Sequence, residues 1–263
     1  MEYSNIILES HDQYASITLN RPDKLNAINY DLLLELGRAI DEINEMIEVR
    51  VVVVKGAGRA FSSGTDLKGL GSGRIDRTRP GYRYHLGQHQ EAYSRIERLE
   101  KPVIAQIHGY ALGGAMELAL ACDFRIAAKD TRFALPEVIY GIIPDLGGCQ
   151  RLVRAVGLLK AKELVIMGRT IDGIEAEKIG FINRAVESED LEAEVKKWAG
   201  ELTGLPPLAV GLGKRMVDKA LDMDILTSLD VNAQAQSILV KTEDFSEAMR
   251  ARVEKRRPEF KGK

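Results

Sequence analysis

The sequence predicts an α/β fold in which helices cover a largely parallel sheet, and three short apolar runs indicate it. Residues 51–54 are all valine and have no polar face, as in a strand that is covered on both sides. Residues 103–107 and 124–127 are further strand-like runs. Strands that alternate with helical segments imply crossover units, which join parallel strands.

The remaining elements follow from the spacing of apolar residues. Alternation around residues 6–8 and 15–19 predicts two N-terminal strands. In residues 30–47 apolar side chains recur every three or four positions, which predicts an amphipathic helix with Asn29 or Asp31 as its N-cap. After Gly168 the strand signals fade, and the last seventy residues are expected to be helical and charged.

Composition excludes several classes of protein. The 263 residues are 45% hydrophobic and 29% charged, which is typical of a globular chain, and a net charge of -2 gives no overall attraction to nucleic acid or to an anionic membrane. Glu117 interrupts the most apolar stretch, so no membrane span is predicted, and the N-terminus lacks the pattern of a signal peptide. Cys122 and Cys149 are too few for a disulfide framework, so both are expected to be reduced and the location cytoplasmic.

Two familiar motifs are incomplete. Gly56 and Gly58 follow a predicted strand, but the dinucleotide-binding fingerprint needs a third glycine where Phe61 stands. His85 and His89 could share one face of a helix, but no third ligand is nearby, so no metal site is predicted. The motifs for a serine nucleophile and for a phosphate-binding loop are absent from the sequence.

Two glycine-containing turns follow predicted strands, at residues 61–66 and 108–117. The second is expected to begin a helix near Gly113 and Gly114. Glycine lets a ligand approach the backbone closely, and the first N–H groups of a helix have no partner within it, so the turns could form an anion-stabilising pocket. Alternatively, the glycines only permit tight packing of a helix on the sheet.

Two carboxylates lie among apolar residues near these turns. Glu117 has no ion-pair partner on its own helix face, and a buried carboxylate without a partner is costly or has a raised pKa. The alternative is that it caps its helix. Glu137 follows Pro136 among further apolar residues. Paired carboxylates beside an anion pocket are what acid/base chemistry next to a polarised carbonyl requires.

Six segments together resemble the crotonase superfamily, specifically the enoyl-CoA hydratases, in the family's order and over nearly the whole chain. They are RPDKLNAI (21–28), AFSSGTDLKGL (60–70), HGYALGGAMELALACD (108–123), FALPEVIYGIIPDLGGCQRL (133–152), GRTIDGIEAEKIGFINRAV (168–186) and EKRRPEF (254–260). The resemblance implies a crotonase-like spiral of ββα units over residues 1–190 and a C-terminal helical trimerisation region over residues 191–263. It also implies a homotrimer or a hexamer that is a dimer of trimers.

The resemblance assigns roles to individual residues. The backbone N–H groups of Thr65 and Gly114 match the oxyanion hole, which holds the thioester oxygen. Glu117 and Glu137 match the two glutamates that hold water, the first assisting its attack at C3 and the second supplying a proton at C2. Thr65 departs from the alanine of many hydratases, and Asp145 from their glycine.

The substrate implied is an acyl-CoA thioester, so coenzyme A arrives with the substrate and no separate cofactor is expected. Residues 250–263 carry seven basic and two acidic side chains, which could hold the phosphates of coenzyme A or could simply be a solvated tail. Residues 71–89 are expected to be a loop that covers or lines the acyl pocket. The residues expected to bind substrate are Lys24, Leu25, Ala27, Asp66, Leu67, Lys68, Phe260 and Lys261.

The function implied is reversible syn addition of water to a 2-enoyl-CoA, giving a 3-hydroxyacyl-CoA. One alternative is a dienoyl-CoA isomerase that uses Glu137 and Asp145. Against it, the isomerase pattern has aspartate where Glu117 stands, and Asp145 is alternatively explained as the cap of the helix that contains Gln150 and Arg151. The other is a non-catalytic protein of the same fold that binds CoA thioesters. Since both glutamates are present, the sequence favours the hydratase.

Overall fold

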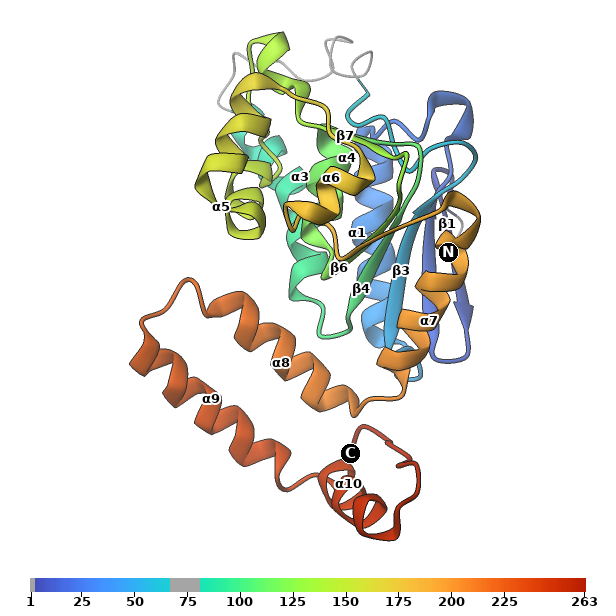
Figure 1. The fold of residues 1–263 in the computed structure, drawn as a ribbon, viewed down its shortest axis with the longest axis vertical. Coiled ribbons are helices and arrows are strands. Elements are labelled where there is room, and N and C mark those ends of the chain that lie inside the picture. Colours follow the sequence, from blue (N-terminus) through green and yellow to red (C-terminus); the bar gives the residue numbers. More distant parts are fainter. Residues whose placement is uncertain (1–2, 67–80) are drawn as a thin grey trace.

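The computed structural model describes residues 3–66 and 81–263 and contains a six-stranded sheet (Figure 1). The strand order is β1-β2-β3-β4-β6-β8, in which β1 and β2 are antiparallel and every later pair is parallel. A second, two-stranded parallel sheet pairs β5 with β7. The strands are β1 (Ile6–His11), β2 (Tyr14–Leu19), β3 (Val51–Gly56), β4 (Val103–Ile107), β5 (Tyr110–Leu112), β6 (Phe124–Ala128), β7 (Arg132–Ala134) and β8 (Arg184–Val186).

The strands that the sequence predicts are confirmed. β5, β7 and β8 were not predicted, because three residues are too few to show a period of two. β8 lies beyond Gly168, in the part of the sequence where the strand signals fade. It pairs with β6 at the edge of the main sheet, so its backbone partners rather than its own composition define it.

The first helix has the predicted face and cap. Helix α1 (Tyr30–Glu45) begins at Asn29, whose side chain accepts a hydrogen bond from the N–H of Leu32 at 2.9 Å. The helix ends two residues before the predicted position, and Ile47 is almost fully exposed. Its apolar stripe is buried against the sheet and consists of Leu32, Leu33, Leu36, Ile40 and Ile43.

Helices cover both faces of the sheet, which explains why β3 has no polar face. Alternate residues of β3, Val52 and Val54, belong to the main core, which also includes side chains of α1, α3 (Gly81–Arg98), α4 (Gly114–Ala121) and α5 (Gly148–Met167). Val51 and Val53 belong to a second core against α7 (Leu191–Thr203). The ends of β3, β4 and β5 therefore lie between helices, where the two glycine turns begin.

Helix α3 corrects one expectation. Residues 81–89 are helical, so the expected loop over residues 71–89 is wrong for that part, while residues 71–80 lie outside the described part of the chain. Tyr93 and Ile96, three apart on the same helix, are fully buried and anchor it to the core. Gly87 lies inside this helix, and a Cβ built there would have no atom within 4 Å. This glycine therefore marks neither a turn nor a close contact.

The C-terminal helices extend away from the body of the molecule. Helix α6 (Gly173–Lys178) precedes β8, and after α7 come α8 (Pro207–Lys219), α9 (Ile225–Leu239) and α10 (Glu243–Glu254), at the lower end of Figure 1. Lys214 on α8 forms a largely buried ion pair with Asp123 at 2.8 Å, which ties α8 to the body. The division at residue 190 remains a prediction; α7, which that division assigns to the C-terminal region, packs against the sheet.

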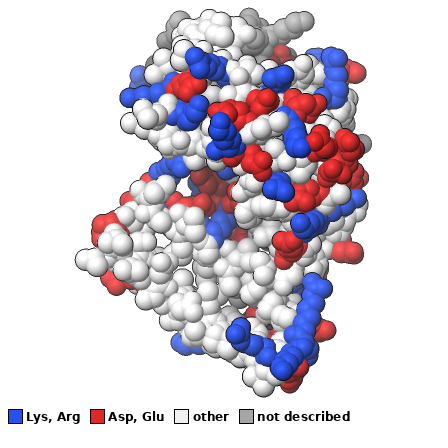
Figure 2. Space-filling view, in the orientation of Figure 1, with Lys and Arg blue, Asp and Glu red and all other residues white. Residues whose placement is uncertain are grey.

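The surface carries charge unevenly. Figure 2 shows acidic and basic side chains interspersed over the body, whereas the face over α8 and α9 is largely uncharged. Within residues 3–66 and 81–263, no helix has the length and apolar character needed to cross a bilayer.

Candidate active site

The turn after β3 is held by a buried serine. The hydroxyl of Ser62 donates to the carbonyl of Asn26 at 2.7 Å and accepts from the N–H of Gly64 at 3.1 Å. Gly64 has a φ of +88°, and a Cβ built there would lie 2.2 Å from the carbonyl oxygen of Leu112. Only glycine permits this approach, which brings the first turn against the second.

The second turn is held through its backbone. Gly113 has a φ of +50° and donates its N–H to the carbonyl of Ala134 at 2.8 Å. A Cβ at Gly113 would lie 2.7 Å from Oε1 of Glu137, so a side chain here would displace that carboxylate. Helix α4 begins at the next residue, Gly114.

Two unpaired amides meet where the turns touch. A Cβ at Gly114 would lie 2.9 Å from Oγ1 and 3.7 Å from the backbone nitrogen of Thr65. Neither the N–H of Thr65 nor that of Gly114 donates a hydrogen bond to any described residue. Two adjacent free N–H groups, one of them at the N-terminus of α4, favour a negatively charged oxygen. The glycines permit the close packing that one sequence hypothesis requires, and the same packing brings the two free N–H groups together.

Glu117 is buried on α4, and its carboxylate accepts hydrogen bonds from the start of another helix, α5. It is 2% exposed, and its Oε1 accepts the N–H groups of Leu146 and Gly148, each at 2.8 Å, at the start of α5. The interpretation that it caps its own helix is therefore wrong. The pKa of Glu117 is raised to about 8, chiefly by burial; the charges of Glu137 and Asp145 contribute to the rise, and the two amides oppose it.

Glu137 lies in the first turn of a 3₁₀ helix, η2 (Pro136–Tyr140), and is half-buried. Burial raises the pKa of its carboxyl group, and the charge of Asp145 adds to the rise. Its Oε2 is buried and has no hydrogen-bond partner among the described residues. A buried acceptor without a partner costs free energy, so this oxygen is available to a ligand or to water.

Asp145 is not the predicted helix cap. Helix α5 begins at Gly148, and its N-cap is Gly147, with no capping bond from a side chain. The carbonyl of Asp145 accepts from Nε2 of Gln90 at 2.7 Å. Because its negative charge raises the pKa of both Glu117 and Glu137, Asp145 lies within electrostatic reach of the pair.

The segment with Lys24, Leu25 and Ala27 lies beside the first turn. The carbonyl of Leu25 accepts from the N–H of Ser63 at 2.8 Å. The carbonyl of Lys24 accepts from the hydroxyl of Ser63 at the longer distance of 3.5 Å. Ile28 pairs with Thr65 in a parallel bridge. These residues therefore border the pair of free amides.

Asp66 is fixed by an ion pair. Its carboxylate contacts the guanidinium of Arg21 at 3.1 Å, and both side chains are mostly buried. The same guanidinium donates to the carbonyl of Ala27. Leu67 and Lys68, which were expected to bind substrate beside Asp66, lie outside the described residues.

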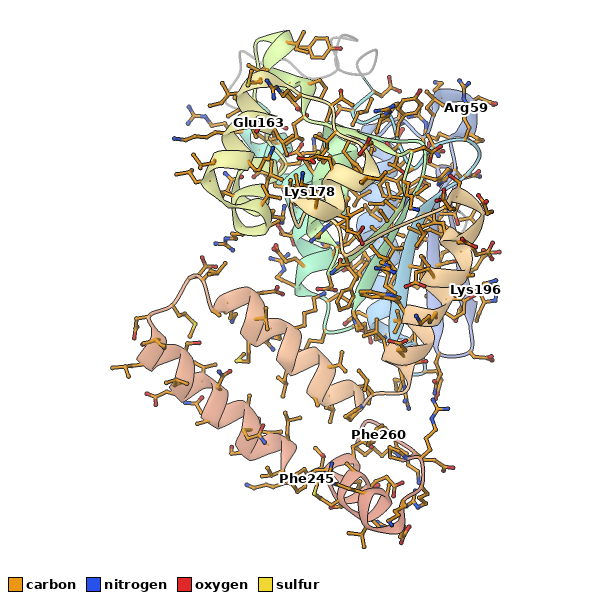
Figure 3. All side chains as sticks on the ribbon, viewed as in Figure 1. Arg59, Glu163, Lys178, Lys196, Phe245 and Phe260 are labelled. Carbon is orange, nitrogen blue, oxygen red and sulfur yellow. The ribbon has the colours of Figure 1, made fainter. Side chains whose placement is uncertain are left out.

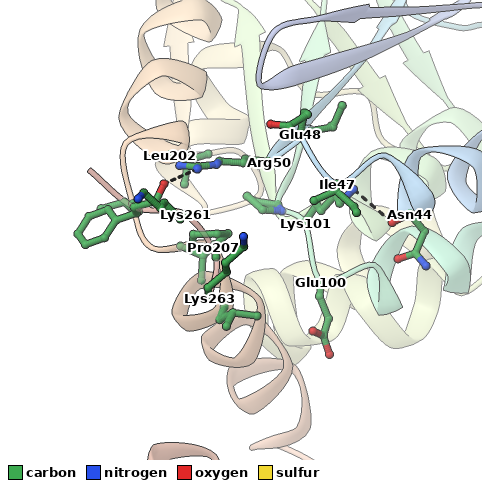
Figure 4. Close-up of a pocket in the computed structure, with 17 residues that line it drawn as sticks. Asn44, Ile47, Glu48, Arg50, Glu100, Lys101, Leu202, Pro207, Lys261 and Lys263 are labelled. Carbon is green, nitrogen blue, oxygen red and sulfur yellow. Dashed lines mark hydrogen bonds between the residues drawn. The ribbon is translucent and has the colours of Figure 1, made fainter. Parts of the chain in front are cut away.

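Phe260 and Lys261 are not brought to this site within one chain. They line a pocket of about 660 Å³ at the start of β3 and β4, together with Arg50 and Lys101 (Figure 4). Arg50 donates to the carbonyl of Phe260 at 2.5 Å. Figure 3 shows Phe260 at the lower end of the molecule, whereas Arg59, just after β3, lies at the upper end.

Three structural residues of the site were missed by sequence reasoning. Asn26 is fully buried in a left-handed conformation, and its amide donates to the carbonyls of Ala57 and Ala60. An asparagine within the turn-like segment was the signal that could have found it. Arg21 and the buried Tyr93, whose hydroxyl donates to the carbonyl of Gly114, had no such local signal.

Known proteins resemble this chain along nearly all of its length. A family model described as enoyl-CoA hydratase/isomerase matches residues 9–263. The chain is 40% identical over 261 residues to a short-chain-enoyl-CoA hydratase of Clostridium acetobutylicum, covering 98% of each chain. It is also 40% identical to a crotonyl-CoA hydratase of Syntrophomonas wolfei, covering 99% of each. A solved enoyl-CoA hydratase from Bacillus anthracis has a TM-score of 0.94 and 37% identity, covering 99% of this chain and 100% of that one. These similarities confirm the predicted fold class.

The contact between Glu117 and α5 predicts the effect of a single methyl group. In Gly148→Ala, the new Cβ would lie 2.8 Å from Oε1 of Glu117 and 2.8 Å from Cβ of Pro144, so the carboxylate or α5 must move. We expect a loss of about 1–3 kcal/mol in the free energy of unfolding, measured by urea denaturation. Gly200→Ala on α7 is the matched control, since nothing lies within 4 Å of its Cβ. Equal stabilities for the two variants would contradict the packing described.

Proposed function

Because the chain belongs to the enoyl-CoA hydratase/isomerase family, we propose that it is an enoyl-CoA hydratase, which adds water reversibly and in syn geometry to a 2-enoyl-CoA to give a 3-hydroxyacyl-CoA. The observation that carries the proposal is the placement of two glutamates with raised pKa values beside two unpaired amides. Relatives named as hydratases at 40% identity support it.

The two amides would stabilise charge in the transition state. The thioester oxygen gains negative charge as water attacks C3, and the N–H groups of Thr65 and Gly114 would donate to it. A preorganised donor of this kind typically contributes about 10²–10³ in kcat. The departure at Thr65 leaves this role intact, because the donor is the backbone and the side chain only shapes the pocket.

The two glutamates would divide the proton transfers. Glu117 assists the attack of water by accepting a proton as the hydroxyl group bonds to C3, and Glu137 supplies the proton that bonds to C2. The buried, unpartnered Oε2 of Glu137 and its raised pKa suit a group that holds water and keeps a proton to donate. The bonds of Glu117 to α5 would hold its carboxylate in a fixed direction.

Substrate binding would begin at the segments that border the amides. Lys24, Leu25, Ala27 and Asp66 lie there, and we expect them to contact the pantetheine and adenine end of coenzyme A. Leu67 and Lys68 continue that segment in the sequence. Since coenzyme A is part of the acyl-CoA substrate and the proton transfers need only the glutamates, we expect no additional cofactor.

We expect the protein to assemble as a homotrimer or as a hexamer of two trimers. Large exposed apolar side chains on α8, on α9 and between them are typical of an interface, and they include Val217, Leu221, Ile225, Leu226, Leu229 and Ile238. The face over these helices is largely uncharged (Figure 2). Because Phe260 and Lys261 lie at the opposite end of the sheet from Glu117, they could serve a substrate only in a neighbouring copy. A cytoplasmic location remains our expectation; Cys122 and Cys149 are both unpaired.

The isomerase is the second candidate because Asp145 lies within electrostatic reach of both glutamates. That chemistry removes a proton at one end of a conjugated diene and returns one at the other, with Glu137 and Asp145 as the two groups. A protein that binds CoA thioesters without catalysis would not require the pair of glutamates. The hydratase uses Glu117, which the isomerase pattern replaces with aspartate, and is therefore favoured.

Replacing either glutamate tests the assignment of the proton transfers. Glu117→Gln and Glu137→Gln should each lower kcat for crotonyl-CoA by at least about 10², because acid/base groups typically contribute that much, while KM stays within about threefold. Loss of absorbance at the conjugated thioester band measures the rate. Glu201→Gln, an exposed carboxylate on α7, is the control and should match wild type. Wild-type turnover in either site variant would remove that residue from the mechanism.

The raised pKa of Glu117 predicts the pH dependence. The mechanism needs Glu117 ionised as the general base and Glu137 protonated as the general acid, so kcat/KM should have a bell-shaped dependence on pH. The pKa of about 8 for Glu117 places one limb of the bell near pH 8. An unshifted glutamate would place this limb near pH 4.5. Initial rates between pH 6 and 9 at constant ionic strength measure it, and Glu117→Gln should lose the limb. A flat wild-type profile over this range would contradict the assignment.

Substrate choice separates the hydratase from the isomerase. In deuterated water the enzyme should convert crotonyl-CoA to 3-hydroxybutyryl-CoA with one deuterium at C2, detected by mass spectrometry. Asp145→Asn should leave this rate within about threefold near the pH optimum, because the oxygen of Glu117 is held by Leu146 and Gly148 and not by Asp145. If crotonyl-CoA were inert while a 3,5-dienoyl-CoA turned over, and Asp145→Asn in folded protein abolished that turnover, the isomerase would replace our proposal.

A further inference from the structure

The turn that carries the Gly114 amide consists of two adjacent glycines, Gly113 and Gly114. Glycine has the widest range of backbone conformations, and neither residue has a side chain that packing could immobilise. A donor that stabilises a transition state must nevertheless point in one direction before the reaction begins. Contacts to the backbone atoms of the two glycines must therefore supply the rigidity.

Two of these contacts come from other backbone groups. The N–H of Gly113 donates to the carbonyl of Ala134 at 2.8 Å, and the carbonyl of Gly113 accepts from the N–H of Glu117 at 3.1 Å. Both fix the peptide groups that flank Gly113. The peptide group after Gly114 belongs to the first turn of α4 and has a further anchor.

That anchor is a tyrosine side chain from another helix. The hydroxyl of Tyr93 on α3 donates to the carbonyl of Gly114 at 2.8 Å. Tyr93 is fully buried, and its ring packs in the main core with α1 and α4. A buried tyrosine hydroxyl needs a partner, and here the partner is the residue that supplies an amide of the pocket. Burial raises the pKa of Tyr93 well above its usual value, so the donor proton is retained at every pH of interest.

We propose that Tyr93 is a positioning residue for the oxyanion hole. Its hydroxyl fixes the carbonyl of Gly114, and the N–H of Glu117 fixes the carbonyl of Gly113, whose peptide group contains the N–H of Gly114. Together the two bonds set the direction in which that N–H points. The proposal rests on the hydratase function proposed above. Holding the peptide groups on both sides of Gly114 defines its φ and ψ. Gly114 has no side chain of its own that could do so. Tyr93 makes no contact with substrate in this role and acts only through Gly114.

The test removes the hydroxyl and leaves the ring. In Tyr93→Phe we expect kcat for crotonyl-CoA to fall about tenfold while KM changes by less than about twofold, because the loss falls on a bond that strengthens in the transition state. The matched control is Tyr3→Phe, which removes another long-range tyrosine bond, from Tyr3 to Glu42 at 2.8 Å, remote from the turns. It should lower the melting temperature by a comparable amount and leave kcat unchanged.

A spectroscopic readout separates positioning from stability. An enoyl-CoA thioester with an extended conjugated chromophore absorbs at longer wavelength when its carbonyl oxygen is polarised. The shift on binding should be reduced in Tyr93→Phe and equal to wild type in Tyr3→Phe. The band of bound ligand reports only on folded protein, and a second donor-free variant, Tyr93→Met, covers a folding failure particular to phenylalanine.

The outcomes distinguish this proposal from the proposed function. Wild-type kcat and a wild-type shift in folded Tyr93→Phe or Tyr93→Met would overturn the positioning role and leave the hydratase intact. If wild-type protein did not hydrate crotonyl-CoA, the proposed function would fail, while the comparison of band shifts would still show whether Tyr93 orients the amide. An equal loss of the shift in Tyr3→Phe would also overturn the proposal, since general destabilisation would then explain it.

Discussion

The site depends on the direct approach of two backbone turns that lie almost fifty residues apart in sequence. Gly64 lies so close to the carbonyl of Leu112 that any Cβ would overlap it, and a Cβ at Gly114 would lie 2.9 Å from Oγ1 of Thr65. Hydrogen bonds of Ser62 with Asn26 and Gly64 hold the first turn, and a hydrogen bond to the carbonyl of Ala134 holds the second. Because the contact is backbone on backbone, the amides left over are rigid and unpaired, which is the condition for stabilising an oxyanion without reorganisation.

Glu117 links the architecture of this site to its chemistry. Two N–H groups at the start of α5 stabilise its charged form, and burial stabilises its neutral form. Burial is the larger effect, which leaves a carboxyl group that can hold or release a proton near neutral pH. The same two bonds fix α5 against α4, so the residue that would handle protons also sets the position of the helix that follows Asp145. A residue with both duties tolerates few replacements.

Much of the fold could be predicted because its signals are local. The valines of β3 and the stripe of α1 show their environment through spacing, and Glu117 stood out because its own helix offers it no partner. The rest depends on backbone groups far along the chain. The amides of Leu146 and Gly148 that hold Glu117 carry no side-chain signature, β8 is defined by pairing with β6, and the hydroxyl of Tyr93 reaches a carbonyl that any residue could provide. Residue types reveal which groups need a partner, and only the fold reveals which partner they find.

The C-terminal tail is remote from the site within one chain, yet its main chain is ordered. Its backbone is held firmly: buried Asp244 accepts the N–H groups of Lys261 at 2.7 Å and Gly262 at 2.9 Å, and Arg50 binds the carbonyl of Phe260. The Lys261 side chain remains exposed. A merely solvated tail would need no buried carboxylate to fix its main chain, since fixing a backbone costs conformational entropy of about 1–2 kcal/mol per residue. An ordered main chain that presents the Lys261 ammonium outward is better suited to contacting a phosphate of coenzyme A that is bound to another copy. The proposed assembly and the proposed binding of coenzyme A are therefore two parts of one proposal.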